Sequence, residues 1–221
     1  MVVFDMAGTT VNEDNVVYKT VRKAINDRGY DFTLEEVLKE GAGKEKLQAI
    51  KSVLALRGID DDILSREIFA AFNEQLDQAY ETMPIVEQPN ATELFEALRA
   101  QGIYVVLNTG YSRPVATSLV AKIGWQVGSD IDALVTASDV PRNRPFPDMI
   151  LHAMQQLGIT DATQVAKVGD SAIDIEEGRN AGCEVTVGIT TGAQTREQLL
   201  AATPTAVIDD LLELLPLVVV R

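Results

Sequence analysis

Residues 2–10 read Val2-Val3-Phe4-Asp5-Met6-Ala7-Gly8-Thr9-Thr10, a short apolar run that ends in an aspartate followed by small and hydroxyl-bearing residues. This pattern predicts a buried β-strand that delivers Asp5 into a turn. In open α/β sheets, ligands bind just beyond the carboxyl ends of the strands, and a glycine followed by two threonines suits an anion there. We therefore expect Asp5 to take part in chemistry, provided that later strand ends supply matching groups.

Composition restricts the partners of the chain. It has 221 residues and a net charge of −14, from 33 acidic and 19 basic residues. An acidic field of this size repels nucleic acid and anionic membranes, so we expect neither as a partner, and an anionic substrate must be held by local cations. The single cysteine, the absence of an apolar run of about 20 residues and the absence of a basic leader predict a cytoplasmic protein. The sequence is also compatible with a homodimer.

Hydrophobic periodicity divides the chain into two parts. Residues 12–83 have helical periodicity with no convincing strand, which predicts an all-helical cap inserted after the first strand. From residue 84 on, helices and strands alternate as in parallel sheets built by right-handed crossovers. The predicted fold class is therefore α/β, a Rossmann-like parallel sheet in a three-layer α/β/α core formed by residues 1–11 and 84–221. The later core strands are expected at 103–108, 133–136, 165–168, 185–187 and 206–208, and the helices between them at 91–100, 114–123, 147–157, 173–181 and 195–201.

Three later segments at or near strand ends carry groups that suit a phosphate and a cation. Thr109-Gly110 offers a hydroxyl and backbone N–H groups, and Arg144 stands in a proline-flanked loop before a helix. Asp170 and Asp174 follow the next strand, and hard oxygen ligands of this type suit Mg²⁺. Each motif alone has an ordinary structural explanation, such as a helix N-terminal charge for Asp174. All of them in order, after Asp5, favour a phosphoryl-transfer site.

This combination resembles the haloacid dehalogenase superfamily of phosphotransferases over nearly the whole chain. The resemblance is to the phosphonatase branch of that superfamily and rests on these motifs: Asp5-Met6-Ala7-Gly8-Thr9-Thr10, Thr109-Gly110-Tyr111-Ser112-Arg113, Arg144-Pro145-Phe146-Pro147, Gly169-Asp170-Ser171 and Glu177-Gly178-Arg179-Asn180-Ala181-Gly182. It implies that Asp5 is a nucleophile that forms an aspartyl-phosphate. It also implies a Mg²⁺ cofactor and a phosphoryl-binding set. The implied metal ligands are Asp5, the Ala7 carbonyl, Asp170 and Asp174, the last as a ligand or as support for one, and the implied phosphoryl-binding residues are Thr109, Gly110 and Arg144.

Ala7 is the informative departure from ordinary phosphatases of the superfamily, most of which carry a second aspartate there to protonate the leaving alkoxide. Such an acid typically supplies about 10²–10⁴-fold in rate. The phosphonatase branch instead breaks a P–C bond after a cap lysine forms an imine with the substrate aldehyde. The Gly-x-x-Lys pattern of that branch falls on Gly43 and Lys46, which makes Lys46 the expected imine residue and Lys44 its rival. Two solvated lysines on a helical turn remain the alternative.

The substrate is left open by two mismatches, since Ala42 and Ala49 stand where the phosphonatase enzyme typically has methionine and histidine. The leading prediction is a Mg²⁺-dependent hydrolase of a small phosphonate resembling phosphonoacetaldehyde. A phosphatase of small phosphomonoesters, such as phosphoglycolate or sugar phosphates, is the alternative. A signalling receiver phosphorylated on aspartate is disfavoured, because its acceptor comes later in a shorter domain without a helical insertion. A pure binding module is less favoured still.

Overall fold

The computed structural model describes residues 1–219, and its core is a six-stranded parallel sheet in the order β5-β4-β1-β6-β7-β8. Every residue of β1 is buried, as expected of a central strand covered on both faces. The predicted α/β class with a parallel sheet is confirmed. The strands of this sheet are β1 (Val2–Asp5), β4 (Val105–Thr109), β5 (Ala133–Thr136), β6 (Ala166–Gly169), β7 (Val185–Ile189) and β8 (Ala206–Ile208).

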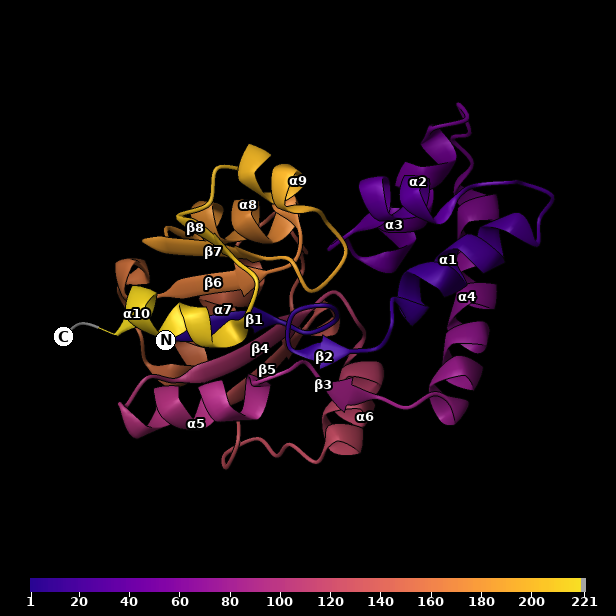
Figure 1. The fold of residues 1–221 in the computed structure, drawn as a ribbon. Helices are drawn as coiled ribbons and strands as arrows, with labels where there is room; N and C mark the ends of the chain where they lie inside the picture. The colour runs from indigo at the N-terminus through magenta and orange to yellow at the C-terminus, as the bar shows by residue number, and fades with distance from the viewer. Residues whose placement is uncertain (220–221) are drawn as a thin grey trace.

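Helices cover both faces of the sheet because neighbouring strand residues point to opposite sides. Phe4 packs against Phe95 in the larger apolar cluster, whereas Val3 belongs to a second cluster with Ile150. The sheet therefore forms the middle of three layers (Figure 1). The core helices are α5 (Ala91–Ala100), α6 (Arg113–Ile123), α7 (Asp148–Leu157), α8 (Ala172–Ala181), α9 (Arg196–Ala201) and α10 (Leu215–Val218), with 3₁₀ turns η1 (Ala137–Asp139), η2 (Ala162–Gln164) and η3 (Leu211–Leu214).

Four helices that follow β1 in the chain and precede the other strands of the sheet form a separate group, on the right in Figure 1. They pack on one another through apolar faces, and a capping box formed by Thr33 and Glu36 begins the second of them. We keep residues 12–83 as the proposed limits of this cap. Its helices are α1 (Val16–Asn26), α2 (Leu34–Gly41), α3 (Lys46–Ala55) and α4 (Asp62–Thr82).

A two-stranded ribbon joins the cap to the core. β2 (Val11–Asn12) pairs antiparallel with β3 (Val86–Glu87). The expectation that residues 12–83 contain no strand is wrong at Asn12, the second residue of β2. Strands of two residues are too short to show a period, and they pair because the chain leaves and re-enters the core at the same place. The ribbon holds the two connections of the cap side by side.

Among the helices of residues 1–219, none combines the length and the apolar character needed to cross a bilayer.

Candidate active site

The three central strands bring the predicted site residues to one edge of the sheet. In the β1–β4 register Asp5 lies opposite Asn108, so Thr109 stands one residue beyond it. On the other side Phe4 lies opposite Val168, which carries Asp170 past the end of β6 to the same edge. Parallel strands end at a common edge, and this is the place where open α/β sheets bind ligands.

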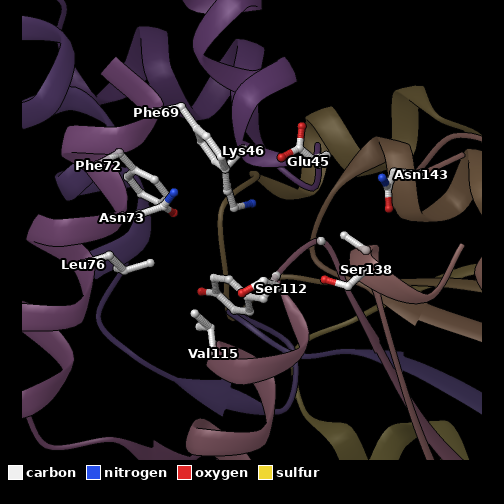
Figure 2. Close-up of a pocket in the computed structure, with 13 residues that line it drawn as sticks. Glu45, Lys46, Phe69, Phe72, Asn73, Leu76, Ser112, Val115, Ser138 and Asn143 are labelled. Carbon is white, nitrogen blue, oxygen red and sulfur yellow. The ribbon is translucent and has the colours of Figure 1, made fainter. Parts of the chain in front are cut away.

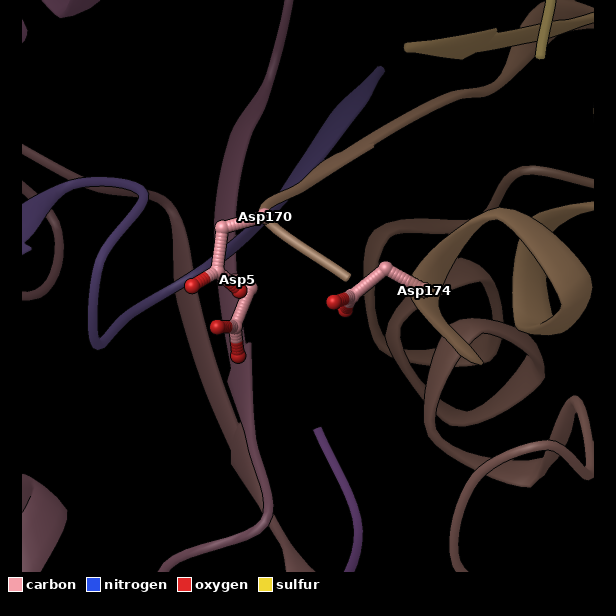
Figure 3. Close-up of side chains that lie close together, drawn as sticks. All are labelled: Asp5, Asp170 and Asp174. Atoms are coloured by element: carbon pink, nitrogen blue, oxygen red, sulfur yellow. The ribbon is translucent and has the colours of Figure 1, made fainter. Parts of the chain in front are cut away.

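Asp5, Asp170 and Asp174 form a buried acidic cluster. Each offers a carboxylate oxygen, and these three oxygens lie within 4.8 Å of one another. Figure 3 shows Asp174 approaching from its helix toward the other two carboxyl groups. The turn that follows Asp5 comes so close that a Cβ on Gly8 would overlap the Asp170 carboxylate. Buried carboxylates gathered in this way are unfavourable without a cation, so the cluster fits Mg²⁺, which prefers oxygen ligands.

Two buried cations contact this cluster. Arg144 Nη2 donates to Asp5 Oδ1 at 2.8 Å, and Nη1 lies 3.1 Å from Asp174 Oδ1. Lys167 Nζ lies 3.1 Å from the same Asp174 oxygen, and both cations reach Glu177, at 3.0 Å and 3.3 Å. The loop around Arg144 thus places its guanidinium at the predicted nucleophile.

Burial and these cations set opposite pKa directions within the cluster. Burial raises the pKa of Asp5 and of Asp170, and neighbouring carboxylates add to the effect. Burial also acts upward on Asp174, but Arg144 and Lys167 outweigh it, so the pKa of Asp174 lies below its ordinary value. Asp174 is therefore, with Glu177, an anionic partner of the two buried cations.

The phosphate-binding candidates lie under the cap. Thr109 is buried, and its Oγ1 accepts a hydrogen bond from the Tyr111 N–H at 3.2 Å. A Cβ on Gly110 would lie 3.2 Å from the carbonyl oxygen of Lys44, so the cap loop covers this turn. Ala7 lies in the turn after Asp5, where it bridges to Val11. Its carbonyl remains a proposed metal ligand.

Lys46 is the first residue of α3 and is only 7% exposed. Its Nζ donates to the Lys44 carbonyl at 2.9 Å and lies 5.2 Å and 5.6 Å from the ring centres of Tyr18 and Tyr111. The Lys44 amine turns away and donates to Ser52. Burial lowers the pKa of Lys46, although Asp5 opposes this change. The two candidate lysines therefore differ: the Lys46 amine is buried between tyrosine rings, and the Lys44 amine is directed to Ser52. The burial of Lys46 excludes the alternative that it is a solvated residue of a helical turn.

A cavity of about 210 Å³ between cap and core receives the Lys46 side chain. Figure 2 shows its amine pointing into the space between the cap helices and Ser112. Both cap and core contribute apolar and polar residues to its lining. Those from the cap are Glu45, Lys46, Phe69, Phe72, Asn73 and Leu76, and those from the core include Ser112, Val115, Ser138 and Asn143.

Sequence reasoning missed Asn108 as a member of the site. Its side-chain amide donates to both oxygens of Glu177 at 3.0 Å, while its Oδ1 accepts from Arg144 at 2.8 Å and from Lys167 at 2.5 Å. The sequence feature that could have identified Asn108 is a lone amide side chain inside an otherwise apolar strand. Lys167, a charged residue in a buried strand next to Gly169-Asp170, carried a similar signal.

Comparisons with known proteins agree with this geometry. Residues 1–182 match the family model of haloacid dehalogenase-like hydrolases. The phosphonoacetaldehyde hydrolase of Bacillus cereus is 32% identical over 203 residues, which cover 87% of this chain and 76% of that protein. A bifunctional phosphonoacetaldehyde hydrolase/aminoethylphosphonate transaminase of Clostridioides difficile is 33% identical over 201 residues, 82% of this chain and 30% of the relative. The chain therefore spans less than a third of that longer protein.

Solved structures share the fold. A phosphonoacetaldehyde hydrolase-like protein from Oleispira antarctica superposes with a TM-score of 0.82 at 25% identity, over 98% of this chain and 90% of that one. A predicted phosphoglycolate phosphatase from Haemophilus somnus superposes with a TM-score of 0.76 at 21% identity, over 98% and 96% of the two chains. The family model and the Bacillus cereus relative show that the protein is an enzyme rather than a signalling receiver or a binding module. It belongs to the haloacid dehalogenase superfamily of hydrolases, in the phosphonatase-like branch.

Proposed function

We propose that this hydrolase uses Mg²⁺ and cleaves the P–C bond of a small phosphonate that carries an aldehyde, such as phosphonoacetaldehyde. The observation that supports this most is the buried Lys46 amine, which enters the cavity next to the strand-end turns. Ala7 stands where an ordinary phosphatase would carry its acid. A site without that acid but with a deprotonatable lysine suits a leaving carbon better than a leaving alkoxide.

The proposed phosphoryl site uses the groups at the strand ends. Asp5, the Ala7 carbonyl, Asp170 and Asp174 would hold or support Mg²⁺, which when bound neutralises charge on the phosphoryl oxygens. Thr109, Gly110 and Arg144 would bind those oxygens, with Arg144 already hydrogen-bonded to Asp5. The same guanidinium can thus orient the attacking carboxylate and screen its repulsion from the phosphonate.

Lys46 and Asp5 then divide the reaction between them. Neutral Lys46 adds to the aldehyde carbon, and protonation of the resulting hydroxyl followed by loss of water leaves an iminium. Asp5 attacks phosphorus, the P–C bond breaks, and its electron pair forms an enamine on Lys46. Water hydrolyses the aspartyl-phosphate to phosphate, and protonation and hydrolysis of the enamine release acetaldehyde and free Lys46. The lowered pKa of Lys46 supports the first step, since only the neutral amine attacks carbonyl carbon.

A phosphatase of small phosphomonoesters is the alternative. The Arg144–Asp5 pair and the acidic cluster would suit a phosphoryl group on oxygen equally well. The fold shared with a protein named as a phosphoglycolate phosphatase is compatible with this alternative. The two proposals differ in what they require of Lys46.

Steady-state phosphate release with Mg²⁺ separates the proposals. The substrates are phosphonoacetaldehyde, phosphoglycolate and a panel of sugar phosphates. Lys46→Arg keeps a positive charge but cannot form the imine, and Lys44→Arg is its matched control because the Lys44 amine contacts Ser52 instead of the cavity. We expect release from phosphonoacetaldehyde, loss of this release in Lys46→Arg and near-parental rates in Lys44→Arg. Turnover of esters alone, undiminished in Lys46→Arg, would establish the alternative.

A further inference from the structure

Lys46 carries a buried nitrogen that has no anionic side chain in contact with it. The residue is 7% exposed, and within the described residues its Nζ makes a single hydrogen bond, to the carbonyl oxygen of Lys44 at 2.9 Å. Among the ion pairs of residues 1–219, which extend to 4.0 Å, none includes Lys46. A buried ammonium without a counter-ion is costly, so other groups must stabilise its charge.

Two aromatic rings occupy the place of a counter-ion. The Lys46 Nζ lies over the ring of Tyr18, 5.2 Å from its centre, and over the ring of Tyr111, 5.6 Å from its centre. Tyr18 belongs to cap helix α1 and Tyr111 to the turn after β4, so one ring comes from the cap and the other from the core. A cation within about 6 Å of a ring centre is attracted by the negative charge of the ring face. The two rings thus supply the attraction that a carboxylate would otherwise supply.

Tyr18 is held in place by the cap loop. It is 4% exposed, and its hydroxyl accepts a hydrogen bond from the Gly43 N–H at 3.0 Å. The Gly43 carbonyl accepts from Arg144 Nη1 at 3.4 Å, and Nη2 of the same guanidinium donates to Asp5 at 2.8 Å. A continuous series of contacts therefore joins the Lys46 amine to the proposed nucleophile through Tyr18.

The two tyrosines differ in their position relative to the proposed phosphoryl site. Tyr111 directly follows the Thr109-Gly110 turn, and its N–H donates to Thr109 Oγ1 at 3.2 Å. A change at Tyr111 would therefore also alter that turn. Tyr18 approaches the amine from the cap, so the effect of its ring on Lys46 can be measured with the turn unchanged.

We propose that the ring face of Tyr18 stabilises the positive charge of the Lys46 nitrogen during imine formation, which makes Tyr18 a positioning residue; this inference rests on the proposed function. The neutral amine and the aldehyde take up one proton and release one water as they form the iminium, so the buried nitrogen becomes cationic. A ring face attracts that cation but neither accepts nor donates a proton. A carboxylate in the same place would pair with the ammonium and keep the amine protonated. The ring therefore suits a nitrogen that alternates between neutral and cationic forms.

Other groups act on this nitrogen without touching it. Burial lowers the pKa of Lys46 most, and the Arg144 guanidinium also lowers it. The carboxylates of Asp5, Glu45 and Glu13, on β1, before α3 and before α1, raise this pKa. A change confined to one tyrosine ring leaves all of these charges in place, so a shift in the titration of the amine reports the ring.

The test measures the charge of the Lys46 nitrogen in two ways. Competitive labelling with trace acetic anhydride across the pH range, quantified on the Lys46 peptide by mass spectrometry, gives the pH at which half of the amine is neutral. Borohydride trapping with acetaldehyde at pH 9 gives the iminium without the phosphoryl step. Tyr18→Phe is the reference variant, because it keeps the ring and loses only the hydroxyl. Two further variants carry singly or triply fluorinated phenylalanine in place of Tyr18, which makes the ring face progressively less negative at nearly constant shape.

The same fluorinated residues in place of Tyr104 are the matched control. Tyr104 is 43% exposed and precedes β4, at the end of the strand opposite the site. Thermal unfolding and circular dichroism check that each variant folds.

We expect Tyr18→Phe to titrate close to the parent, and the triply fluorinated ring to lower the labelling midpoint of Lys46 by about 0.4–1.5 pH units relative to Tyr18→Phe. The trapped iminium should fall by about 2- to 30-fold, with the singly fluorinated ring between the two and the Tyr104 variants at the parental values. Equal midpoints and equal trapped fractions across the fluorine series would overturn this inference while leaving the proposed function intact. A parent protein that hydrolyses phosphonoacetaldehyde but yields no Lys46 adduct with either aldehyde would overturn both.

Discussion

Gly43→Ala tests whether the cap loop rests on the core during turnover. Gly43 lies between α2 and α3, where its N–H donates to the Tyr18 hydroxyl at 3.0 Å and its carbonyl accepts from Arg144 at 3.4 Å. Its φ is +71°, and a Cβ there would overlap the side chains of Ile173 and Ser171 from the core. An alanine at this position therefore strains the backbone and also pushes the loop off the core.

The two effects have separate sizes. The left-handed backbone costs an L-residue about 1–2 kcal/mol wherever it occurs. Insertion of a methyl group into a packed contact costs about 1–3 kcal/mol, and this part opposes only the seated loop. Because an energy of about 1–3 kcal/mol corresponds to about 5- to 150-fold in an equilibrium, the ratio of seated to unseated loop should fall by that factor.

Gly58→Ala is the matched control. Gly58 also has a φ of +71°, but nothing lies within 4 Å of the position that its Cβ would take. Both variants should lose about 1–2 kcal/mol of stability in urea unfolding. Only Gly43→Ala should lower kcat/KM for phosphonoacetaldehyde, by up to about 150-fold. Equal kcat/KM in Gly43→Ala and Gly58→Ala would show that the reaction does not need the loop where the structure places it.

Three other substitutions probe the site. Asp5→Asn should abolish phosphate release from every substrate while Mg²⁺ still binds, and retained turnover would exclude a nucleophilic Asp5. Glu177→Gln should lower the free energy of unfolding by about 3 kcal/mol in urea, because buried Arg144 and Lys167 lose an anionic partner; a loss below about 1 kcal/mol would contradict this. The folded protein raises the pKa of Glu13 from 4.5 to about 7, so its stability should fall by roughly 3 kcal/mol as pH rises through that window. Glu13→Gln should remove most of this fall, and an unchanged stability profile between pH 4.5 and 8 would refute it.

The core of the fold could be predicted from the sequence because its strands are buried on both faces and read as unbroken apolar runs. The strand expected at 133–136 is β5 as observed. The strand expected at 103–108 is shifted, since β4 spans Val105–Thr109. Its ends depend on which residues β1 and β5 offer for pairing, and a single segment of sequence does not contain that information.

The acidic cluster could be predicted for a related reason: parallel strands end at a common edge of the sheet, so Asp5 and Asp170 were expected on the same edge. The surroundings of Asn108 and Glu13 follow no such rule. Asn108 meets Glu177, 69 residues away in the chain, and Glu13 is buried at the entrance to the cap. Contacts between distant elements depend on packing, which the local pattern does not encode.

Mass spectrometry of the borohydride-treated protein tests the central claim most directly. The claim is that Lys46 forms an imine with the substrate under the cap. With phosphonoacetaldehyde and Mg²⁺, we predict an N-ethyl or N-phosphonoethyl adduct on the peptide that contains Lys46, with Lys44 unmodified, and loss of turnover in proportion to the adduct. Continued hydrolysis of phosphonoacetaldehyde with an unmodified Lys46 peptide would contradict the account.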